Sequence, residues 1–433
     1  MKETATRISR RTLLKRSGLG ATAVGVTGLA GCIGGDSNST QSDDDSDGAQ
    51  GDSGDDDTST QSTVELRLGA MAPLTGSYAA LGEDERLGVE VGVEHANADF
   101  ENLNVQTSFK DSKLDPKVGL RRAKEFIEED QVDALVVGDG TTVTKAVSKY
   151  CSQQGVPMIG VQSASEKITG ENCDNYTFRS AAHSYQNMKP TAEWAMENLG
   201  SSFVTMGADY SWGHESVGNF VDVAEKNGGE TVQQLWPKFG TTDWSSYIQK
   251  AADTDADFVL IRAGGSGLVS AFKQIDSFGL SDDMDVVGIA SHTAALGAGE
   301  AATGYYGNMP YNYHMETEQN QRFVEDYRSM GDGSPPSTYS CSAYVGTRFM
   351  CKAALESGTG PDELVSGLES VEISGPLGTQ SIRECDHQAK TPMYVGQFVP
   401  NDGDGDAAVK REMISEHGVG TNNRPCSETG CSL

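Results

Sequence analysis

The chain has 433 residues, with 63 acidic against 33 basic side chains, a formal net charge of -30 and a sequence pI near 4.5. This charge argues against nucleic acid as a partner, because phosphate binding needs a basic surface. The chain is longer than a typical domain with a single hydrophobic core, and its length suits about two domains. The acidic excess is typical of a protein kept soluble in concentrated salt, so we expect a halophilic source, with an acidic secreted protein as the alternative.

The N-terminus resembles an export signal. Residues 9–15 (SRRTLLK) form a twin-arginine pattern, a weakly apolar stretch follows at 18–30, and the stretch LAGC ends at Cys32 like a lipobox, in which the cysteine is lipidated. The apolar stretch has about 13 residues and falls short of the ~20 that span a bilayer, which argues against a transmembrane helix. We predict a twin-arginine lipoprotein signal over 1–32 and a mature protein anchored through Cys32 at the extracellular face of the membrane.

The next segment, 33–63, consists mainly of Asp, Ser, Gly, Thr and Gln, and residues 34–63 contain no Lys, Arg or aromatic side chain. Such a segment cannot bury enough apolar surface to offset the entropy of ordering. We therefore predict a disordered acidic tether.

Strands and helices are predicted to alternate from residue 64 onward. Strands are indicated at 64–68, 103–109, 132–137 and 156–161, with helices at 82–97, after Asp115-Pro116 and after Thr142. The alternation begins again after 176–180, with helices at 184–198, 215–226, 244–252 and 267–278 and strands at 203–206, 232–236, 258–261 and 286–289. This order predicts parallel sheets with helices on both faces, in two wound domains that leave a cleft between their loops.

Small polar residues follow two of the predicted strands. Thr141 and Thr142 stand where a helix begins, and Gln162, Ser163 and Ser165 follow the next strand. Ligands bind at the carboxyl ends of strands in open α/β sheets, and a helix N-terminus favours an anion such as a carboxylate. The alternative is that these hydroxyls only cap helices.

The segment from residue 64 to about 400 resembles the type I periplasmic solute-binding proteins of ABC importers, in the branch with leucine/isoleucine/valine and amide receptors. The stretches that carry the resemblance are 73–76 (PLTG) with Gly82 and Asn97, Asp111 with Asp115-Pro116, 138–146, 159–169, 209–213 (DYSWG), 374–378 (SGPLG) and 386–389 (DHQA). The resemblance implies an α/β protein of two doubly wound parallel-sheet lobes joined by a three-strand hinge. Lobe one is expected at 64–181 plus 310–372, lobe two at 182–309 plus 373–400, and a tail at 401–433.

The same resemblance implies a ligand site between the lobes. Thr141 and Thr142 match a serine position that binds the α-carboxylate in amino-acid receptors, and Trp212 matches an aromatic that closes over the ligand. The full set of candidate ligand-binding residues is Thr141, Thr142, Gln162, Ser163, Ser165, Tyr210, Trp212, Gly264 and His292.

One position departs from the amino-acid receptors. Ala290 stands where an acidic residue normally pairs with the ligand ammonium. Asp139 or Asp209 could substitute, or the ligand could lack an ammonium. We therefore expect a small polar metabolite of the branched-chain or hydrophobic amino-acid class, with urea, a short amide or a carboxylate as alternatives, and a sensory protein of the same fold as an alternative to transport.

Seven cysteines besides Cys32 suit an oxidising exterior. The plausible pairs are Cys151 with Cys173, Cys351 with Cys385, and Cys426 with Cys431, which leaves Cys341. No paired CxxC or histidine cluster supports the alternative of a zinc site. The enzyme motifs GxSxG, HExxH and the Walker loop are absent from the sequence. We predict a monomeric binding protein, not an enzyme, with no cofactor or metal; its partners are a small-molecule ligand and ABC permease subunits.

Overall fold

The computed structural model describes residues 63–76, 78–403 and 407–433. The predicted export signal with Cys32 and the tether through residue 62 lie outside these residues and stay predictions. Within the described part of the chain, no helix is long and apolar enough to cross a membrane.

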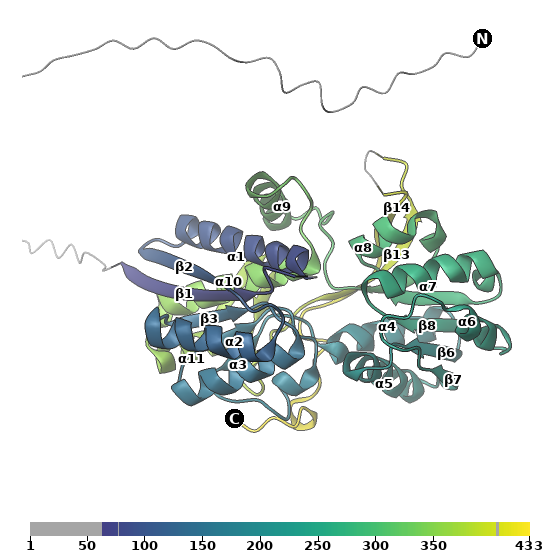
Figure 1. The fold of residues 1–433 in the computed structure, drawn as a ribbon, viewed down its shortest axis with the longest axis horizontal. Coiled ribbons are helices and arrows are strands. Elements are labelled where there is room, and N and C mark those ends of the chain that lie inside the picture. Colours follow the sequence, from purple (N-terminus) through teal and green to yellow (C-terminus); the bar gives the residue numbers. More distant parts are fainter. Residues whose placement is uncertain (1–62, 77, 404–406) are drawn as a thin grey trace, which may run out of the picture. The chain divides into compact units, whose positions relative to one another are not determined.

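The first sheet has five parallel strands in the order β2-β1-β3-β4-β5 (Figure 1). These strands are β1 (Val64–Ala72), β2 (Leu103–Asp111), β3 (Ala134–Val137), β4 (Met158–Gly160) and β5 (Thr177–Arg179). Both faces of β3 are buried: Ala134 and Val136 join one apolar core, while Leu135 and Val137 join another. This two-sided burial explains why β3 is a continuous apolar run in the sequence.

Helices cover both faces of the first sheet (Figure 1). On one face α2 (Pro116–Lys124) packs against α3 (Thr141–Gln154), and on the other α1 (Ala79–Asp99) packs against α10 (Thr338–Ser357). A Cβ added at Gly92 would come within 3.0 Å of the Thr347 side chain, so glycine allows the close approach of α1 and α10. Two further helices, α9 (Glu318–Met330) and α11 (Pro361–Ser370), complete this lobe.

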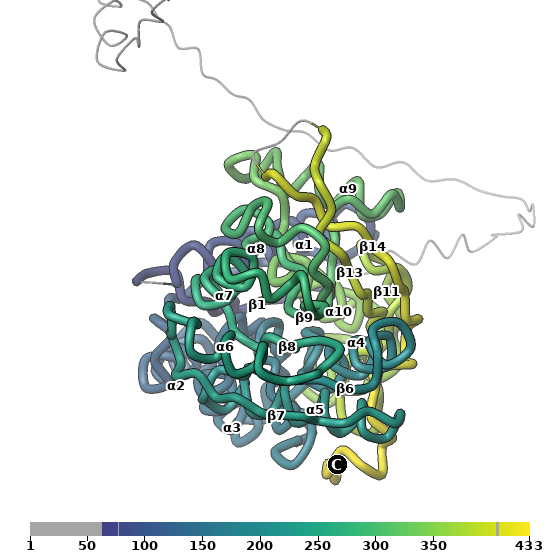
Figure 2. The backbone as a smooth tube through the Cα atoms, turned by 90° about the vertical axis from the view of Figure 1, so that its right-hand side faces the viewer, coloured from purple at the N-terminus to yellow at the C-terminus, as the bar shows by residue number. Residues whose placement is uncertain are grey.

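The second sheet has seven strands in the order β14-β13-β10-β9-β8-β6-β7. Five are parallel: β6 (Ser202–Gly207), β7 (Glu230–Leu235), β8 (Phe258–Arg262), β9 (Asp285–Ile289) and β10 (Tyr306–Met309). Figure 2 shows the two antiparallel strands β13 (Met393–Pro400) and β14 (Val409–His417) in yellow, side by side. The helices of the second lobe are α4 (Ser184–Asn198), α5 (Ser211–Lys226), α6 (Ser245–Ala252), α7 (Gly265–Phe278) and α8 (His292–Ala298). The predicted strands and helices of both lobes are therefore confirmed in type and order.

The C-terminal boundaries differ from those expected. The hairpin of β11 (Glu372–Gly375) and β12 (Gly378–Ser381) contributes Ile373 to the first lobe's core, and Ile382 and Ala389 join the same core. Residues 373–392 were expected in lobe two. After β10 the chain returns to the second sheet only at β13. The expected tail also supplies β14, whose backbone pairs antiparallel with β13 along its whole length.

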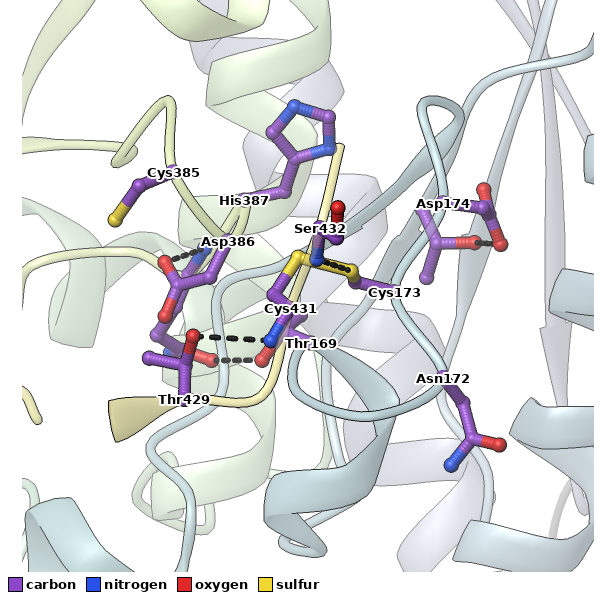
Figure 3. Close-up of a disulfide and its surroundings, with 12 residues drawn as sticks. Thr169, Asn172, Cys173, Asp174, Cys385, Asp386, His387, Thr429, Cys431 and Ser432 are labelled. Atoms are coloured by element: carbon purple, nitrogen blue, oxygen red, sulfur yellow. Dashed lines mark hydrogen bonds between the residues drawn. A yellow bond between two sulfur atoms is a disulfide. The ribbon is translucent and has the colours of Figure 1, made fainter. Parts of the chain in front are cut away.

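The cysteine pairings expected from the sequence are wrong. The disulfides in the described residues are Cys173–Cys431, which Figure 3 shows, and Cys385–Cys426, with Cα atoms 5.6 and 6.0 Å apart. The three free cysteines among residues 63–433, Cys151, Cys341 and Cys351, are buried in the apolar cores. Pairing depends on where the chain returns in space, and after β14 it returns to the first lobe, where Cys431 meets Cys173.

Candidate functional site

The first strand edge, which we define as residues 138–142 and 162–165, brings together two of the predicted hydroxyls. Thr141 Oγ1 and Ser163 Oγ share a hydrogen bond of 3.1 Å. Helix α3 begins after Gly140, which has no side chain to cap it, and Thr142 is exposed. The alternative that these threonines serve only as caps is not supported, because neither side chain caps α3. The first N–H groups of α3 remain available to an acceptor.

Arg179 holds the second loop of this edge in place. It is fully buried, its Nη1 donates to the carbonyl oxygens of Ser163 and Ser165, and its Nε donates to Gln388 Oε1 at 2.6 Å. The Ser165 hydroxyl donates to Glu215 of α5 at 3.0 Å, so this side chain links the two lobes and is not free for a ligand. Gln162 Oε1, in contrast, is buried without a partner within the described part of the chain.

Two buried carboxyl groups lie behind the first strand edge. Ser112 donates to Asp139 Oδ1 at 2.7 Å, and burial raises the pKa of Asp139 to about 7. Glu85 is 1 % exposed, and its pKa is raised well above the usual range by burial and then by Asp139. A Cβ at Gly138 would lie 2.6 Å from Glu85 Oε2, so a larger residue there would displace the Glu85 carboxyl group. The cavity beside Glu85 is about 10 Å³, room for about one water and too small for a metabolite.

The second strand edge, which we define as residues 209–212, 262–264 and 290–292, contains a buried arginine. Arg262 ends β8, is 2 % exposed and donates from Nη1 to Asn308 Oδ1 at 2.8 Å. Asn308 in turn donates to Asn187 Oδ1 at 3.0 Å. The Arg262 guanidinium carbon lies 4.8 Å from the centre of the Trp212 ring. Burial lowers the pKa of Arg262 to about 10, and no carboxylate in the described ranges forms an ion pair with it.

Aromatic side chains gather around this base. The Tyr210 ring lies 4.6 Å from Phe239 and 5.9 Å from Trp212, centre to centre. Burial raises the pKa of Tyr210 to about 12, opposed by Arg262, and the phenols of Tyr339 and Tyr78 raise it further. Those two tyrosines belong to the first lobe and are 42 % and 43 % exposed. Tyr210 and Trp212 were predicted; the sequence reasoning missed Arg262, Phe239, Tyr78 and Tyr339.

In the described residues the last two candidates, Gly264 and His292, form no hydrogen bond or ring contact with Arg262. Gly264 precedes α7, is exposed and has no atom within 4 Å of an added Cβ, so it leaves open space beside the second edge. His292 packs edge-on against Tyr313 with ring centres 5.5 Å apart. Its pKa is lowered by burial and by the charges of Arg411 and His314. His292 therefore belongs to a cluster with Tyr313 and Arg411.

The acids that could receive an ammonium are also placed. Ala290 is buried, and its carbonyl oxygen accepts a hydrogen bond from Arg411. The position that carries an acid in the amino-acid receptors therefore offers no carboxylate here. Asp209 is exposed and lies 2.7 Å from His214 Nε2, and Asp139 has no exposed surface. In the described part of the chain, no group of three His, Cys, Asp or Glu is arranged to hold a metal ion.

The helices that start at the two edges share one feature. Helices α3, α5 and α7 follow β3, β6 and β8, and none of the three has a side-chain cap at its N-terminus. Helix α8, by contrast, is capped by the Ser291 hydroxyl. Uncapped N-termini leave backbone N–H groups for a ligand to satisfy.

Two wound lobes, with polar groups and aromatic rings at the carboxyl ends of their strands, define a two-lobe receptor for a small solute. The model of the family "Periplasmic binding protein" matches residues 65–405, and the chain belongs to this family. The predicted fold and family are thereby confirmed.

Known relatives agree with this membership. The Leu/Ile/Val-binding protein homolog 4 of Brucella abortus is 25 % identical over 351 residues, which cover 77 % of this chain and 84 % of the relative. The closed leucine-, isoleucine-, valine-, threonine- and alanine-binding protein of Brucella ovis matches with a TM-score of 0.77 and 23 % identity, covering 85 % and 98 % of the two chains. A solute-binding protein of an ABC transporter from R. palustris, in complex with benzoate, matches with a TM-score of 0.72 and 19 % identity, covering 85 % and 100 %. These relatives are solute-binding proteins and not enzymes.

Proposed function

We propose that this protein is the lipid-anchored, extracellular substrate-binding component of an ABC importer, and that it captures a small carboxylate-bearing metabolite for its permease. The observation that carries the proposal is the hydroxyl pair of Thr141 and Ser163 beside the uncapped N-terminus of α3. A carboxylate can accept hydrogen bonds from hydroxyls and from free helix N–H groups at once. The relatives support a carboxylate, since amino acids and benzoate both carry one.

A thermal-shift screen tests ligand capture directly. A bound ligand raises the apparent stability by mass action, by about 2.7 kcal/mol when its concentration is 100 times Kd. We expect a carboxylic acid, or an amino acid, to raise the melting temperature of the purified protein, and urea and acetamide to leave it unchanged. A shift with urea or acetamide and none with any acid would contradict the carboxylate.

The anchor and the transport role need separate tests. We expect Cys32→Ser to move the protein from the membrane fraction to the medium without changing ligand affinity, because Cys32 is not among the residues of the candidate site. Deletion of the gene should abolish uptake of the same ligand, whereas unchanged uptake with loss of a response to that ligand would favour the sensory alternative.

A further inference from the structure

The guanidinium of Arg262 is a buried positive charge without a negative partner in the described residues. We propose that Arg262 binds the carboxylate of the ligand and that the ligand is an organic acid without an ammonium group. This inference rests on the proposed function and names the substrate class of that site.

Other buried arginines are better satisfied. Arg348 forms an ion pair with Asp99 at 2.8 Å, although its Nε has no partner in the described residues. Arg179 forms no ion pair with a carboxylate in the described residues, but all three of its guanidinium nitrogens donate hydrogen bonds. Arg262 Nε is buried and has no partner in the described ranges, and only Nη1 donates to a protein acceptor there, Asn308. An unpaired buried charge is costly, so such a group marks a place where a ligand supplies the missing charge.

The contacts of Arg262 leave one edge of the guanidinium without a protein acceptor in the described residues. Asn308 holds Nη1 and is itself held by Asn187, while the Trp212 ring covers one face. The edge formed by Nε and Nη2 is left, and two parallel N–H groups on such an edge match the two oxygens of a carboxylate. The side chain is therefore fixed before the ligand arrives, which reduces the entropy lost on binding.

The candidate acids around this site do not offer a carboxylate to a ligand ammonium. Ala290 supplies no acid, and Asp209 lies beside His214. Asp139 has no exposed surface, and burial makes its charged form unfavourable. A ligand ammonium would lie near the Arg262 cation without a carboxylate to offset the repulsion. An α-amino acid is thus a poorer match than the corresponding acid that lacks the amine.

The aromatic side chains suit an apolar body on that acid. Phe239 is 64 % exposed and its ring lies 4.6 Å from the Tyr210 ring, centre to centre. Exposed rings beside a fixed cation favour a flat or branched apolar group attached to a carboxylate.

Matched ligand sets test the inference with the purified protein. The sets are benzoate with benzamide, 3-phenylpropanoate with phenylalanine, and 4-methylpentanoate with leucine, titrated by tryptophan fluorescence and calorimetry. We expect an acid to bind roughly 100-fold more tightly than its amide or amino-acid counterpart, since a buried charge pair is being satisfied. Arg262→Gln should lower the affinity for the acid by roughly 100-fold and leave that for the amide within about twofold. Arg262→Lys should fall between, and Arg322→Gln, an exposed control, should match the wild type.

Each other outcome is decisive. If phenylalanine or leucine binds more tightly than its acid, the substrate class is wrong while the proposed function stands. If no member of any set binds, the proposed function fails as well. If Arg262→Gln weakens acid and amide equally, or both Arg262 variants unfold by circular dichroism, Arg262 is structural and the inference is overturned.

Discussion

The two strand edges of this protein are built alike but hold different buried ionisable groups. Both lie at the carboxyl ends of parallel strands, and both begin helices without side-chain caps. The first edge backs onto two buried acids, Asp139 and Glu85, whereas the second contains a buried base, Arg262. The difference teaches that the fold sets the place of a ligand and that a few buried ionisable groups set its chemistry.

The hydrogen bonds of the two edges differ as well. Ser163 and Ser165 are fixed by Arg179 and Glu215 before any ligand arrives. At the second edge the amides of Asn308 and Asn187 hold only one nitrogen of Arg262. The first edge therefore offers a rigid rim, and the second offers the unpaired charge.

The largest expected effect concerns the acids of the first edge. The pKa of Asp139 is raised from 3.8 to about 7, so the folded state holds its proton more tightly than the unfolded state does. Its contribution to stability is present below pH ~4, falls as the pH rises towards about 7 and is then constant. The shift corresponds to about 4 kcal/mol, and the raised pKa of Glu85 acts in the same direction. Chemical denaturation at pH 5 and pH 8, at constant salt, should show the loss.

Asp139→Asn keeps the acceptor for Ser112 and should remove most of that slope. Asp257 is the control, because its pKa is lowered: hydrogen bonds from the backbone and hydroxyl of Ser202 outweigh the opposing effect of burial. Asp257→Asn should therefore lose stability at pH 8 and leave the slope between pH 5 and pH 8 unchanged. A wild-type protein that is equally stable at both pH values would contradict the assignment of a buried acid to this edge.

The next effect concerns the covalent link between the lobes. After β14 of the second sheet, residues 418–433 return to the first lobe, where Cys431 bonds to Cys173. Within this segment Arg424 pairs with Glu166 and donates to Asn219 of α5 at 2.6 Å. The double variant Cys173→Ala/Cys431→Ala should lose about 3 kcal/mol of unfolding free energy, because the unfolded chain gains freedom.

Reductant separates this effect from packing. Dithiothreitol should lower the melting temperature of the wild type by more than that of the double variant. Cys341→Ala is the control, since Cys341 is free and buried in the first core, and its loss of stability should not depend on reductant. An equal response of all three proteins to dithiothreitol would show that the link does not stabilise the fold.

A smaller effect is expected at the ring that covers Arg262. Trp212→Ala should weaken ligand binding by about 2 kcal/mol, or roughly 30-fold, because the cation loses its aromatic face and the ligand loses a wall. Trp212→Phe should keep part of the affinity but lose most of the fluorescence change on binding. Trp194→Phe, whose ring packs on Tyr306 instead, should keep both. A full fluorescence change in Trp212→Phe would place the ligand elsewhere.

Much of the fold could be predicted from the sequence because its signals are local. Helix α4 was predicted with its observed bounds, and β3 was predicted from an apolar run buried on both faces. The placement of the 372–381 hairpin, strand β14 and the disulfides could not, because each depends on partners far along the chain. The residues of β11 alternate between buried and exposed, as in many strands, and nothing in the local sequence shows which core Ile373 joins.

The candidate site divides in the same way. Thr141 and Ser163 were found because hydroxyls that follow strands converge at one edge of a parallel sheet. Arg262 ends the run FVLIR, and that charge after a buried strand was a signal in the sequence. Its importance lies in the missing partner, which is a property of the packed structure. Ser165 illustrates the reverse error, since its hydroxyl is engaged by Glu215.

The smallest effect tests whether the rim of the first edge contacts the ligand. Thr141→Ala should weaken acid binding by about 1 kcal/mol, or roughly fivefold, because one hydroxyl hydrogen bond to a charged group is lost while the helix N–H groups remain. Thr142→Ala is the control: Thr142 is exposed one residue further along α3 and should bind within twofold of the wild type. Equal affinities in both variants, with Arg262→Gln still impaired, would assign carboxylate recognition to the second edge alone. Because the second edge supplies the charge of Arg262 and the first edge is held rigid, we expect both edges to contribute to binding. The losses of affinity in Arg262→Gln and Thr141→Ala measure their relative contributions.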